Sequence, residues 1–327
     1  MSDNIIKRHV VGVDVGVELT TYAIVDVQGS ILAKESFCTS DYPNVNEYVS
    51  VLSEKILMLA EQNGGYESIR SVGISAPSGN FQTGSMENAS NMPWKGHVPL
   101  TAMLRDRMGL AVALGNDAHV TAVGERAFGA AHGLQNFIVV TISHGGLGSC
   151  IFLDGHPHLG TDGFAGEFGH ICIIENGRQC SCGHRGCLEE YASARGLAET
   201  VREMIETEGK DSILKDINTL TLQVIADACE KGDEVAIEAF QRTGRYLGNA
   251  LATYASLVDP EKIILTGDMT TYCKWMMDVL KESFETNIFQ NLKGKIDIII
   301  SPLNNSERDV LGASALAWEV KEYSLFK

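Results

Sequence analysis

Three thiols and an imidazole lie within one short segment of this chain, and together they could bind a metal ion. Cys180, Cys182 and Cys187 fall within eight residues, and His170 lies ten residues before the first of them. Three thiolates and one imidazole are a usual tetrahedral ligand set for structural zinc. A disulfide cluster or ordinary thiol burial is the alternative, but C-x-C-G-x-x-G-C is tighter than disulfide frameworks usually are. We therefore expect a zinc site at these four residues.

Two carboxylates bracket the expected zinc site. Glu167 lies before it and Glu189 after it, so the fold that gathers the thiols would also fix both carboxylates. Carboxylate oxygens, and the amides of Asn91 and Asn116, accept the hydrogen bonds that ligand hydroxyls donate. A solvated surface charge is the alternative for either glutamate alone. Their shared anchor favours a site for a polyhydroxy ligand.

Two further turns follow apolar runs and carry groups suited to phosphate or to a cation. In the first, Asp14 could hold hydrated magnesium while Gly16 lets a phosphate approach the backbone. The second contains Gly145, Gly146 and Gly148, whose N–H groups could form an anion nest. An ordinary hairpin is the alternative for each turn, but the repetition of the pattern favours function.

A third turn ends at Asn116 and Asp117, directly after the apolar run 111–114. Its carboxylate lies at a strand end, where α/β proteins bind ligands, although a helix N-cap is the interpretation that we favour for this pair by itself. The sequence contains no G-x-x-x-x-G-K-S/T and no G-x-S-x-G. A P-loop site and a nucleophile-elbow hydrolase are therefore excluded.

The composition limits the remaining classes. The chain has 327 residues, a formal net charge of −16 and 44% hydrophobic residues, as expected of a globular protein with two domains of about 150 residues. Because its basic residues do not cluster in the sequence, we expect no nucleic-acid partner. No run approaches the roughly 20 apolar residues of a membrane span, and residues 1–9 lack a signal-peptide core. We therefore expect a cytoplasmic protein with reduced thiols and no membrane partner.

The elements that must position these side chains alternate between strands and helices. Strands are expected at 10–15, 21–27, 30–37, 72–75, 111–114, 137–142, 149–153, 262–265 and 296–300, and helices at 46–62, 118–131, 188–206, 223–230, 234–257 and 312–320. Residues 77–97 are rich in Gly, Ser, Asn and Pro and predict a long loop. Similar strand–turn–strand patterns near residues 14–29 and 141–155 indicate a weak internal duplication. The expected class is α/β.

The motif E-x-G-H followed by C-x-C-G-x-x-G-C-x-E, at Glu167 to His170 and Cys180 to Glu189, resembles that of the ROK family. The resemblance extends over nearly the whole chain. It implies the actin-like ATPase (ribonuclease H-like) fold, with two lobes around a central cleft. We expect a first lobe at 1–118 and a larger one at 119–309, with a final helix at about 310–327 able to pack back on the first lobe.

The resemblance also implies roles for individual residues. Asp117 would be the catalytic base, and the same histidine and cysteines would bind structural Zn²⁺. Sugar would contact Gly79, Asn91, Asn116, Asp117, Glu167, His170 and Glu189. The nucleotide would lie near Asp14, Gly16, Gly145, Gly146, Gly148 and Gly267.

We therefore expect a kinase, acting as a homodimer, that transfers the γ-phosphoryl group of ATP with Mg²⁺ to the 6-OH of a hexose or N-acetylhexosamine. The alternative is a catalytically silent sugar-binding sensor or regulator. It is suggested by Glu18 and His144, which replace hydroxyl residues of the family's phosphate motifs D-x-G-G-T-K and G-T-G-x-G-G. Direct repression is disfavoured because the family's repressors carry an N-terminal DNA-binding domain, whereas the first strand here begins by His9.

Overall fold

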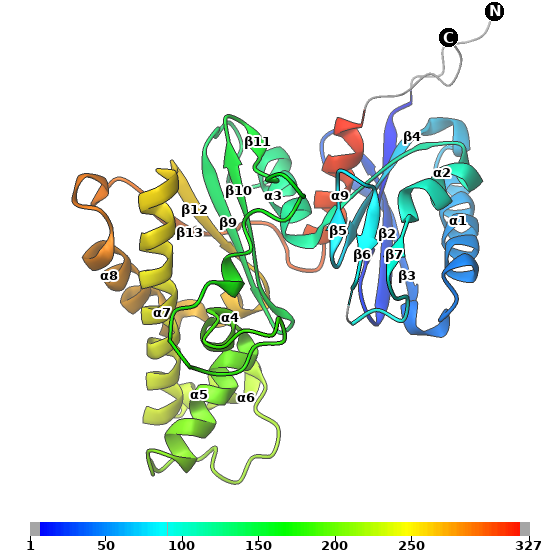
Figure 1. The fold of residues 1–327 in the computed structure, drawn as a ribbon. Helices are drawn as coiled ribbons and strands as arrows, with labels where there is room; N and C mark the ends of the chain where they lie inside the picture. The colour runs from blue at the N-terminus through cyan, green and yellow to red at the C-terminus, as the bar shows by residue number, and fades with distance from the viewer. Residues whose placement is uncertain (1–6, 90, 321–327) are drawn as a thin grey trace, which may run out of the picture. The chain divides into compact units, whose positions relative to one another are not determined.

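The computed structural model describes residues 7–89 and 91–320. The chain forms two compact units, one of residues 1–133, 159–165 and 302–327, and the other of residues 134–158 and 166–301. Their helices and strands are labelled in Figure 1. Each unit has its own sheet and its own hydrophobic core.

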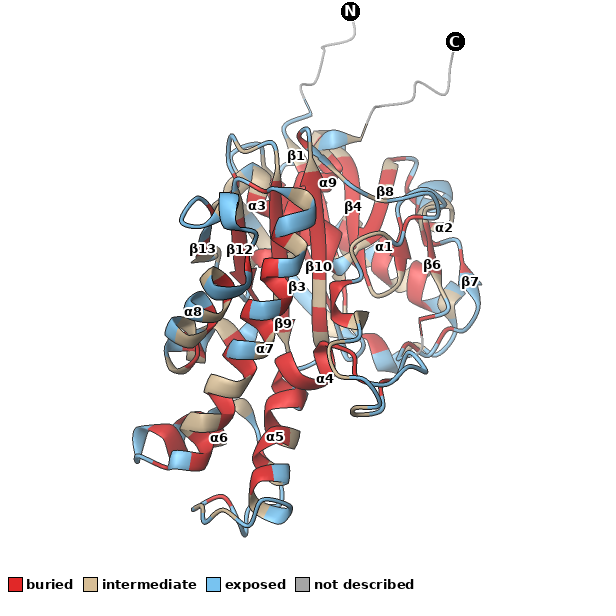
Figure 2. Ribbon diagram, turned by 60° about the vertical axis from the view of Figure 1, so that its left-hand side comes forward, coloured by how far each residue is buried: buried red, intermediate tan, exposed pale blue. Residues whose placement is uncertain are grey.

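The sheet of the first unit has five strands in the order β3-β2-β1-β4-β8. β1 pairs with β2 antiparallel and with β4 parallel, and β4 pairs with β8 parallel. The strands are β1 (His9–Val15), β2 (Leu19–Asp26), β3 (Ile31–Cys38), β4 (Ile69–Ala76) and β8 (Ala111–Asn116). β1 and β4 are rich in buried β-branched residues because both faces are covered, and both are largely red in Figure 2.

Four helices accompany this sheet, namely α1 (Val45–Gln62), α2 (Leu100–Met108), α3 (Asp117–Phe128) and α9 (Arg308–Glu319). α9 comes very close to β1 and β4 because glycines leave room for it. A Cβ on Gly12 would lie 2.2 Å from the Val310 carbonyl oxygen, and one on Gly73 would lie 1.9 Å from that of Ala313. Close backbone packing therefore fixes α9 on the sheet.

The segment expected to be a long loop carries a small sheet of its own. β5 (Gly79–Asn80), β6 (Ser85–Glu87) and β7 (His97–Val98) pair antiparallel in that order. The loop prediction was wrong here because these strands are only two or three residues long, too short to give a periodic pattern.

The sheet of the second unit repeats the topology of the first. Its order is β11-β10-β9-β12-β13, with β9 and β10 antiparallel and β9, β12 and β13 parallel. The strands are β9 (Phe137–Ser143), β10 (Gly146–Leu153), β11 (His156–Pro157), β12 (Lys262–Thr266) and β13 (Asp297–Ile300). The predicted internal duplication is confirmed.

The helices of the second unit are α4 (Glu189–Ala192), α5 (Ala194–Glu206), α6 (Leu222–Glu230), α7 (Glu234–Val258) and α8 (Met277–Asn287). The single helix expected over 188–206 is broken at Ser193, which is extended (φ −101°, ψ 173°) and caps α5 by accepting a hydrogen bond from the Gly196 N–H. The sequence did not predict α2 or α8. Short 3-10 helices lie at Thr39–Asp41, Tyr66–Ser68, Phe168–His170, Asp268–Trp275 and Gln290–Leu292.

The expected lobe boundary after residue 118 falls inside α3, which belongs to the first unit. α3 packs against α9 at Gly124 and Gly312, where a Cβ on Gly124 would lie 2.8 Å from the Gly312 Cα. The final helix ends at Glu319, and residues 321–327 of the expected helix lie outside the described residues. Within residues 7–89 and 91–320, none of the helices combines the length and the apolar character of a transmembrane span.

Candidate functional site

The four predicted zinc ligands lie together in the second unit. One ligand atom from each of His170, Cys180, Cys182 and Cys187 lies within 4.8 Å of the others, and the thiols are free. The Cys182 and Cys187 sulfurs are 3.6 Å apart, and the Cys180 sulfur is 3.7 Å from His170 Nδ1. A zinc tetrahedron with Zn–S bonds of about 2.3 Å has edges of about 3.7 Å. The donor set and its spacing therefore fit zinc.

Two features of the backbone fold the segment that carries these cysteines. Gly183 (φ 93°) and Gly186 (φ 78°) adopt conformations that favour glycine. Arg178 then ties the segment to α4 and α5: its Nη1 donates to the carbonyls of Glu190 and Gly196 at 2.5 and 2.9 Å. Its guanidinium also pairs with Glu203. Arg178, two residues before Cys180, was not predicted from the sequence.

Glu189 lies between the β9–β10 turn and the segment 170–187 that carries the four proposed zinc ligands, here called the zinc segment. Its Oε1 lies 3.3 Å from the Cys180 sulfur and 3.9 Å from His170 Nδ1. Its Oε2 would lie 2.7 Å from a Cβ on Gly146, so the carboxylate of Glu189 packs directly against that glycine. Glu167 is exposed and directly precedes the 3-10 helix that ends at His170. The structure thus brings Glu189 and His170 together with the cysteines, and Glu167 is adjacent in the chain.

The glycine-rich segment 143–148 is a tight hairpin, which was the alternative to an anion nest. Gly146 and Gly148 pair with Ser143 and Thr141 as strand residues. Positive φ in the turn is confined to Gly146 (φ 143°), whereas a nest needs successive N–H groups turned to one side. The backbone N–H of His144 donates to Asp268 Oδ2 at 3.3 Å, so that donor is occupied by a carboxylate.

A cavity of about 330 Å³ adjoins this turn. Its lining includes His144, Asp268, Thr271 and Tyr272. Gly267, predicted near adenosine, directly precedes Asp268 and has φ 101°. A Cβ there would lie 2.2 Å from the Ile142 carbonyl oxygen, so the chain needs glycine to turn against β9. A volume of this size is at the lower end of small-molecule pockets.

In the first unit, Asn116 and Asp117 join the end of β8 to the start of α3. Asn116 is the N-cap, and its Oδ1 accepts a hydrogen bond from the Ala118 N–H at 2.9 Å. Asp117 is the first helical residue, is exposed, and accepts from the same N–H at 2.8 Å. Gly79 packs on the strand end, where its Cβ would lie 2.5 Å from the Gly115 carbonyl oxygen. The cap is Asn116, which leaves the Asp117 carboxylate at the strand end.

Asp14 lies near the end of β1, where it pairs with Ser75 of β4. The pKa of Asp14 is raised to about 7, mainly by burial and also by the charges of Asp309 and Asp117, whereas Arg308 lowers it. The Ser75 hydroxyl is near enough to lower this pKa, yet it is buried without a partner at hydrogen-bond distance. Carboxylates beside an unsatisfied hydroxyl form an oxygen-rich environment of the kind that hydrated magnesium occupies.

Arg308 and Asp309 belong to the same cluster, and sequence reasoning missed both. They begin α9, and Arg308 donates from Nε and Nη2 to the two Asp309 carboxylate oxygens at 2.8 and 3.0 Å. Arg308 is only 9% exposed. The charges of Asp309, Asp14 and Asp117 raise its pKa against the effect of burial. An arginine–aspartate pair at the start of a helix of small residues was the available signal.

The Thr20 hydroxyl, which follows the β1–β2 turn, is already hydrogen-bonded inside the first unit. Thr20 is fully buried, and its Oγ1 lies 2.8 Å from the Thr39 hydroxyl and 2.9 Å from that of Tyr48. Glu18 is exposed in the turn. Gly16 is needed for the turn itself, because a Cβ there would lie 2.7 Å from the Leu19 carbonyl oxygen.

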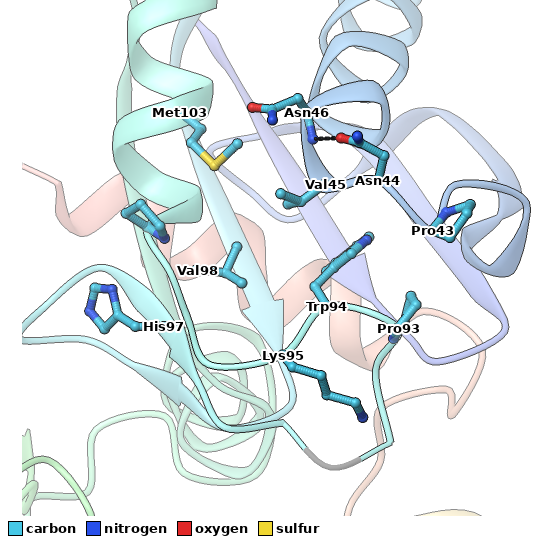
Figure 3. A pocket seen from close by; sticks show the side chains of 11 residues that line it. Pro43, Asn44, Val45, Asn46, Pro93, Trp94, Lys95, His97, Val98 and Met103 are labelled. Carbon is cyan, nitrogen blue, oxygen red and sulfur yellow. Dashed lines mark hydrogen bonds between the residues drawn. The ribbon is translucent and has the colours of Figure 1, made fainter.

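A second hollow of about 500 Å³ lies in the first unit, between the start of α1 and the segment 93–103 (Figure 3). Trp94 is buried in its wall and donates from Nε1 to the Tyr42 carbonyl at 3.0 Å. His97 and Lys95 lie at its rim, as Figure 3 shows. Asn91, expected to bind sugar, is exposed in the same loop but does not line this hollow.

Comparisons with known proteins identify two kinds of relative. The sequence model described as "ROK family" matches residues 10–320. A glucokinase of Halalkalibacterium halodurans is 30% identical over 325 residues, covering 96% of each chain. The crystal structure of a ROK family glucokinase from Streptomyces griseus in complex with glucose and AMPPNP is 29% identical with a TM-score of 0.78, covering 95% of this chain and 100% of that one. A ROK family transcriptional regulator, described as a homolog of the E. coli MLC protein, is 25% identical with a TM-score of 0.84, covering 96% of this chain and 78% of that one.

Proposed function

This chain belongs to the ROK family and has its actin-like ATPase fold, and on that premise we propose that it is an ATP-dependent sugar kinase. The acceptor is the 6-OH of a hexose or of an N-acetylhexosamine. The observation that carries the proposal is the position of Asp117, an exposed carboxylate at the carboxyl end of β8 and the first residue of α3. Relatives described as glucokinases at about 30% identity support it.

Asp117 is proposed to accept the proton of the attacking hydroxyl. Phosphoryl transfer needs little covalent work from a protein, so positioning of the hydroxyl and neutralisation of charge carry most of the effect. The hydrogen bond from the Ala118 N–H to Asp117 Oδ1 fixes the direction of this carboxylate. In the proposal, Gly79, Asn91, Asn116, Glu167, His170 and Glu189 orient the sugar.

The zinc proposal rests on the Cys3His donor set, whose spacing fits a tetrahedral ion. When bound, zinc would hold its segment in one conformation and would take no part in phosphoryl transfer. His170 and Cys180 would then fix Glu189, which lies within 4 Å of both. A histidine ligand needs its second ring nitrogen oriented by a partner, and here that nitrogen is proposed to face the sugar.

The residues proposed to bind the nucleotide are Asp14, Gly16, Gly145, Gly146, Gly148 and Gly267. Magnesium, when bound, would supply positive charge at the phosphates. Asp14 would hold it through oxygen ligands, which suits a carboxylate beside the unpartnered Ser75 hydroxyl. The cavity next to Gly267 is offered as the place for the adenosine.

A second candidate function is a sugar-binding regulator without phosphoryl transfer. The specific observation in its favour is Asp268, whose carboxylate accepts the His144 N–H and puts a negative charge in a turn proposed for phosphate. The exposed Glu18 adds another negative charge in the β1–β2 turn. The similar regulator structure supports this candidate.

An ADP-release assay over a panel of hexoses and N-acetylhexosamines with Mg-ATP tests the proposal. The kinase proposal predicts turnover on at least one sugar. Sugar binding by calorimetry without ADP release on any member of the panel would reject it and favour the regulator. We also propose a homodimer, by family resemblance, which sedimentation would test.

A further inference from the structure

The start of α9 lies at the carboxyl ends of the strands of the first sheet, where Asp14 and Asp117 also lie. Gly73 approaches Ala313, and the Ser71 hydroxyl donates to the Ala317 carbonyl at 2.7 Å. Since residue numbers rise along α9 as they fall along β4, the helix runs antiparallel to the strand. Its first residues, Arg308 and Asp309, therefore lie at the carboxyl ends of β1 and β4.

Three carboxylates and one guanidinium share this edge of the first unit. Asp14 comes from β1, Asp117 from α3 and Asp309 from α9, and Arg308 interacts electrostatically with all three. Arg308 is 9% exposed and makes two hydrogen bonds to Asp309. A buried guanidinium held by a planar two-point contact has little freedom to leave. It is therefore a fixed positive charge beside Asp14 and Asp117.

We propose that the Arg308 guanidinium is a built-in counter-ion of Asp14 and Asp117, which competes with a divalent cation for these carboxylates. The inference deepens the proposed function and rests on it for the role of the cation. A guanidinium and a divalent ion at one carboxylate cluster repel each other. The cation therefore binds weakly until a nucleotide contributes its phosphate oxygens, so that productive cation binding is coupled to the nucleotide.

Titration of the full-length protein with Mn²⁺ alone, followed by the electron paramagnetic resonance of free Mn²⁺ at pH 8 and fixed ionic strength, tests this inference. Arg308→Gln removes the charge and keeps polar contacts. Even at the dielectric constant of water, a divalent ion about 6 Å from a guanidinium is disfavoured by about tenfold in affinity, so tenfold is the smallest effect expected beside a buried arginine. We therefore expect Arg308→Gln to bind Mn²⁺ at least about tenfold more tightly than the unaltered chain.

Two further variants control the measurement. Arg308→Lys keeps the charge, so its Mn²⁺ affinity should stay within about twofold of the unaltered chain. Arg126→Gln removes one positive charge from the same unit at the far end of α9, where Arg126 lies 3.9 Å from Glu319. That end is about 17 Å along the helix, so this variant should leave Mn²⁺ affinity unchanged. If Arg308→Gln fails to fold, the lysine variant still decides, because a gain of tenfold with the charge retained contradicts the proposal.

The outcomes separate this inference from the kinase proposal. Equal Mn²⁺ affinity in the unaltered chain and Arg308→Gln, or no detectable binding by either, would overturn the counter-ion role whatever the turnover. Tighter Mn²⁺ binding by Arg308→Gln supports it. The same result without turnover on any sugar supports the counter-ion and rejects the kinase.

Discussion

At the scale of single residues, the carboxylate of Asp117 has two roles to separate. It begins α3, where it accepts a hydrogen bond from the Ala118 N–H, and it is the proposed base. Asn116 already caps the helix, so removing the Asp117 charge should cost little stability.

We predict that Asp117→Asn loses at least 100-fold in kcat, because general base catalysis contributes about 10²–10⁴, while sugar affinity changes by less than about tenfold. Calorimetric sugar titration and ADP release measure the two quantities. Asp106→Asn, an exposed aspartate of α2 that pairs with Arg105, is the control and should leave both unchanged. Loss of sugar binding or of folding in Asp117→Asn would make the residue structural.

Asp14 gives a pH-dependent stability whose sign follows from its pKa. The folded-state pKa of about 7 lies above the ordinary 3.8, so folding disfavours the ionised carboxylate. The resulting penalty is small near pH 4, grows up to about pH 7 and is constant above it.

Asp14→Asn should therefore unfold at nearly the same urea concentration as the unaltered chain at pH 4, and be more stable by up to about 4 kcal/mol at pH 8. The measurement uses metal-free protein. A stabilisation that is larger at pH 4 than at pH 8 would contradict the assigned shift.

The individual side chains were predicted from the sequence to different degrees. The zinc ligands were found because all four lie within one short segment. Their proximity is confirmed, and the metal stays a prediction. Arg308 was missed because its surroundings come from β1, α3 and α9, which are distant in sequence and meet only through the packing of α9. No local pattern contains that information.

At the scale of elements, the zinc segment is the piece whose order should depend on an ion. Its cysteines and His170 have no regular helix or strand of their own, and its backbone turns at two positive-φ glycines. Structural zinc sites contribute folding free energy directly.

We predict one zinc ion per chain by metal analysis of reduced protein, and its loss in Cys182→Ala together with at least tenfold weaker sugar binding. Cys150→Ala is a poor control because that thiol is buried, so the exposed Cys38→Ala serves instead and should keep the metal. Stoichiometric zinc in Cys182→Ala would show that Cys182 is not a ligand.

Elements were predicted best where their pattern was long. α1, α6, α7 and the strands of both five-stranded sheets apart from β11 lie within a few residues of their expected positions. β11, which has only two residues, was not expected. The break between α4 and α5 was missed because the apolar spacing continues through it, and only the cap at Ser193 marks it. β5, β6 and β7 are fixed by pairing with each other, which a single-strand pattern does not encode.

At the scale of the whole molecule, the two five-stranded sheets share one topology, β3-β2-β1-β4-β8 in the first unit and β11-β10-β9-β12-β13 in the second. This shared topology explains why a weak sequence repeat was visible. Family membership and fold followed from the motif E-x-G-H followed by C-x-C-G-x-x-G-C-x-E, because that motif is specific and lies in one short segment. The exact extent of each unit did not follow, because α3 and α9 join the first unit through close glycine contacts rather than through chain order.

Phosphorus NMR of the protein with Mg-ATP and a sugar that it binds tests the central claim most directly. A 6-OH sugar kinase predicts the growth of ADP signals and of one phosphomonoester resonance split by the two protons of a CH2 group, both abolished by Asp117→Asn. ATP that persists at the rate of the protein-free control, while calorimetry shows the same sugar bound, would contradict the claim.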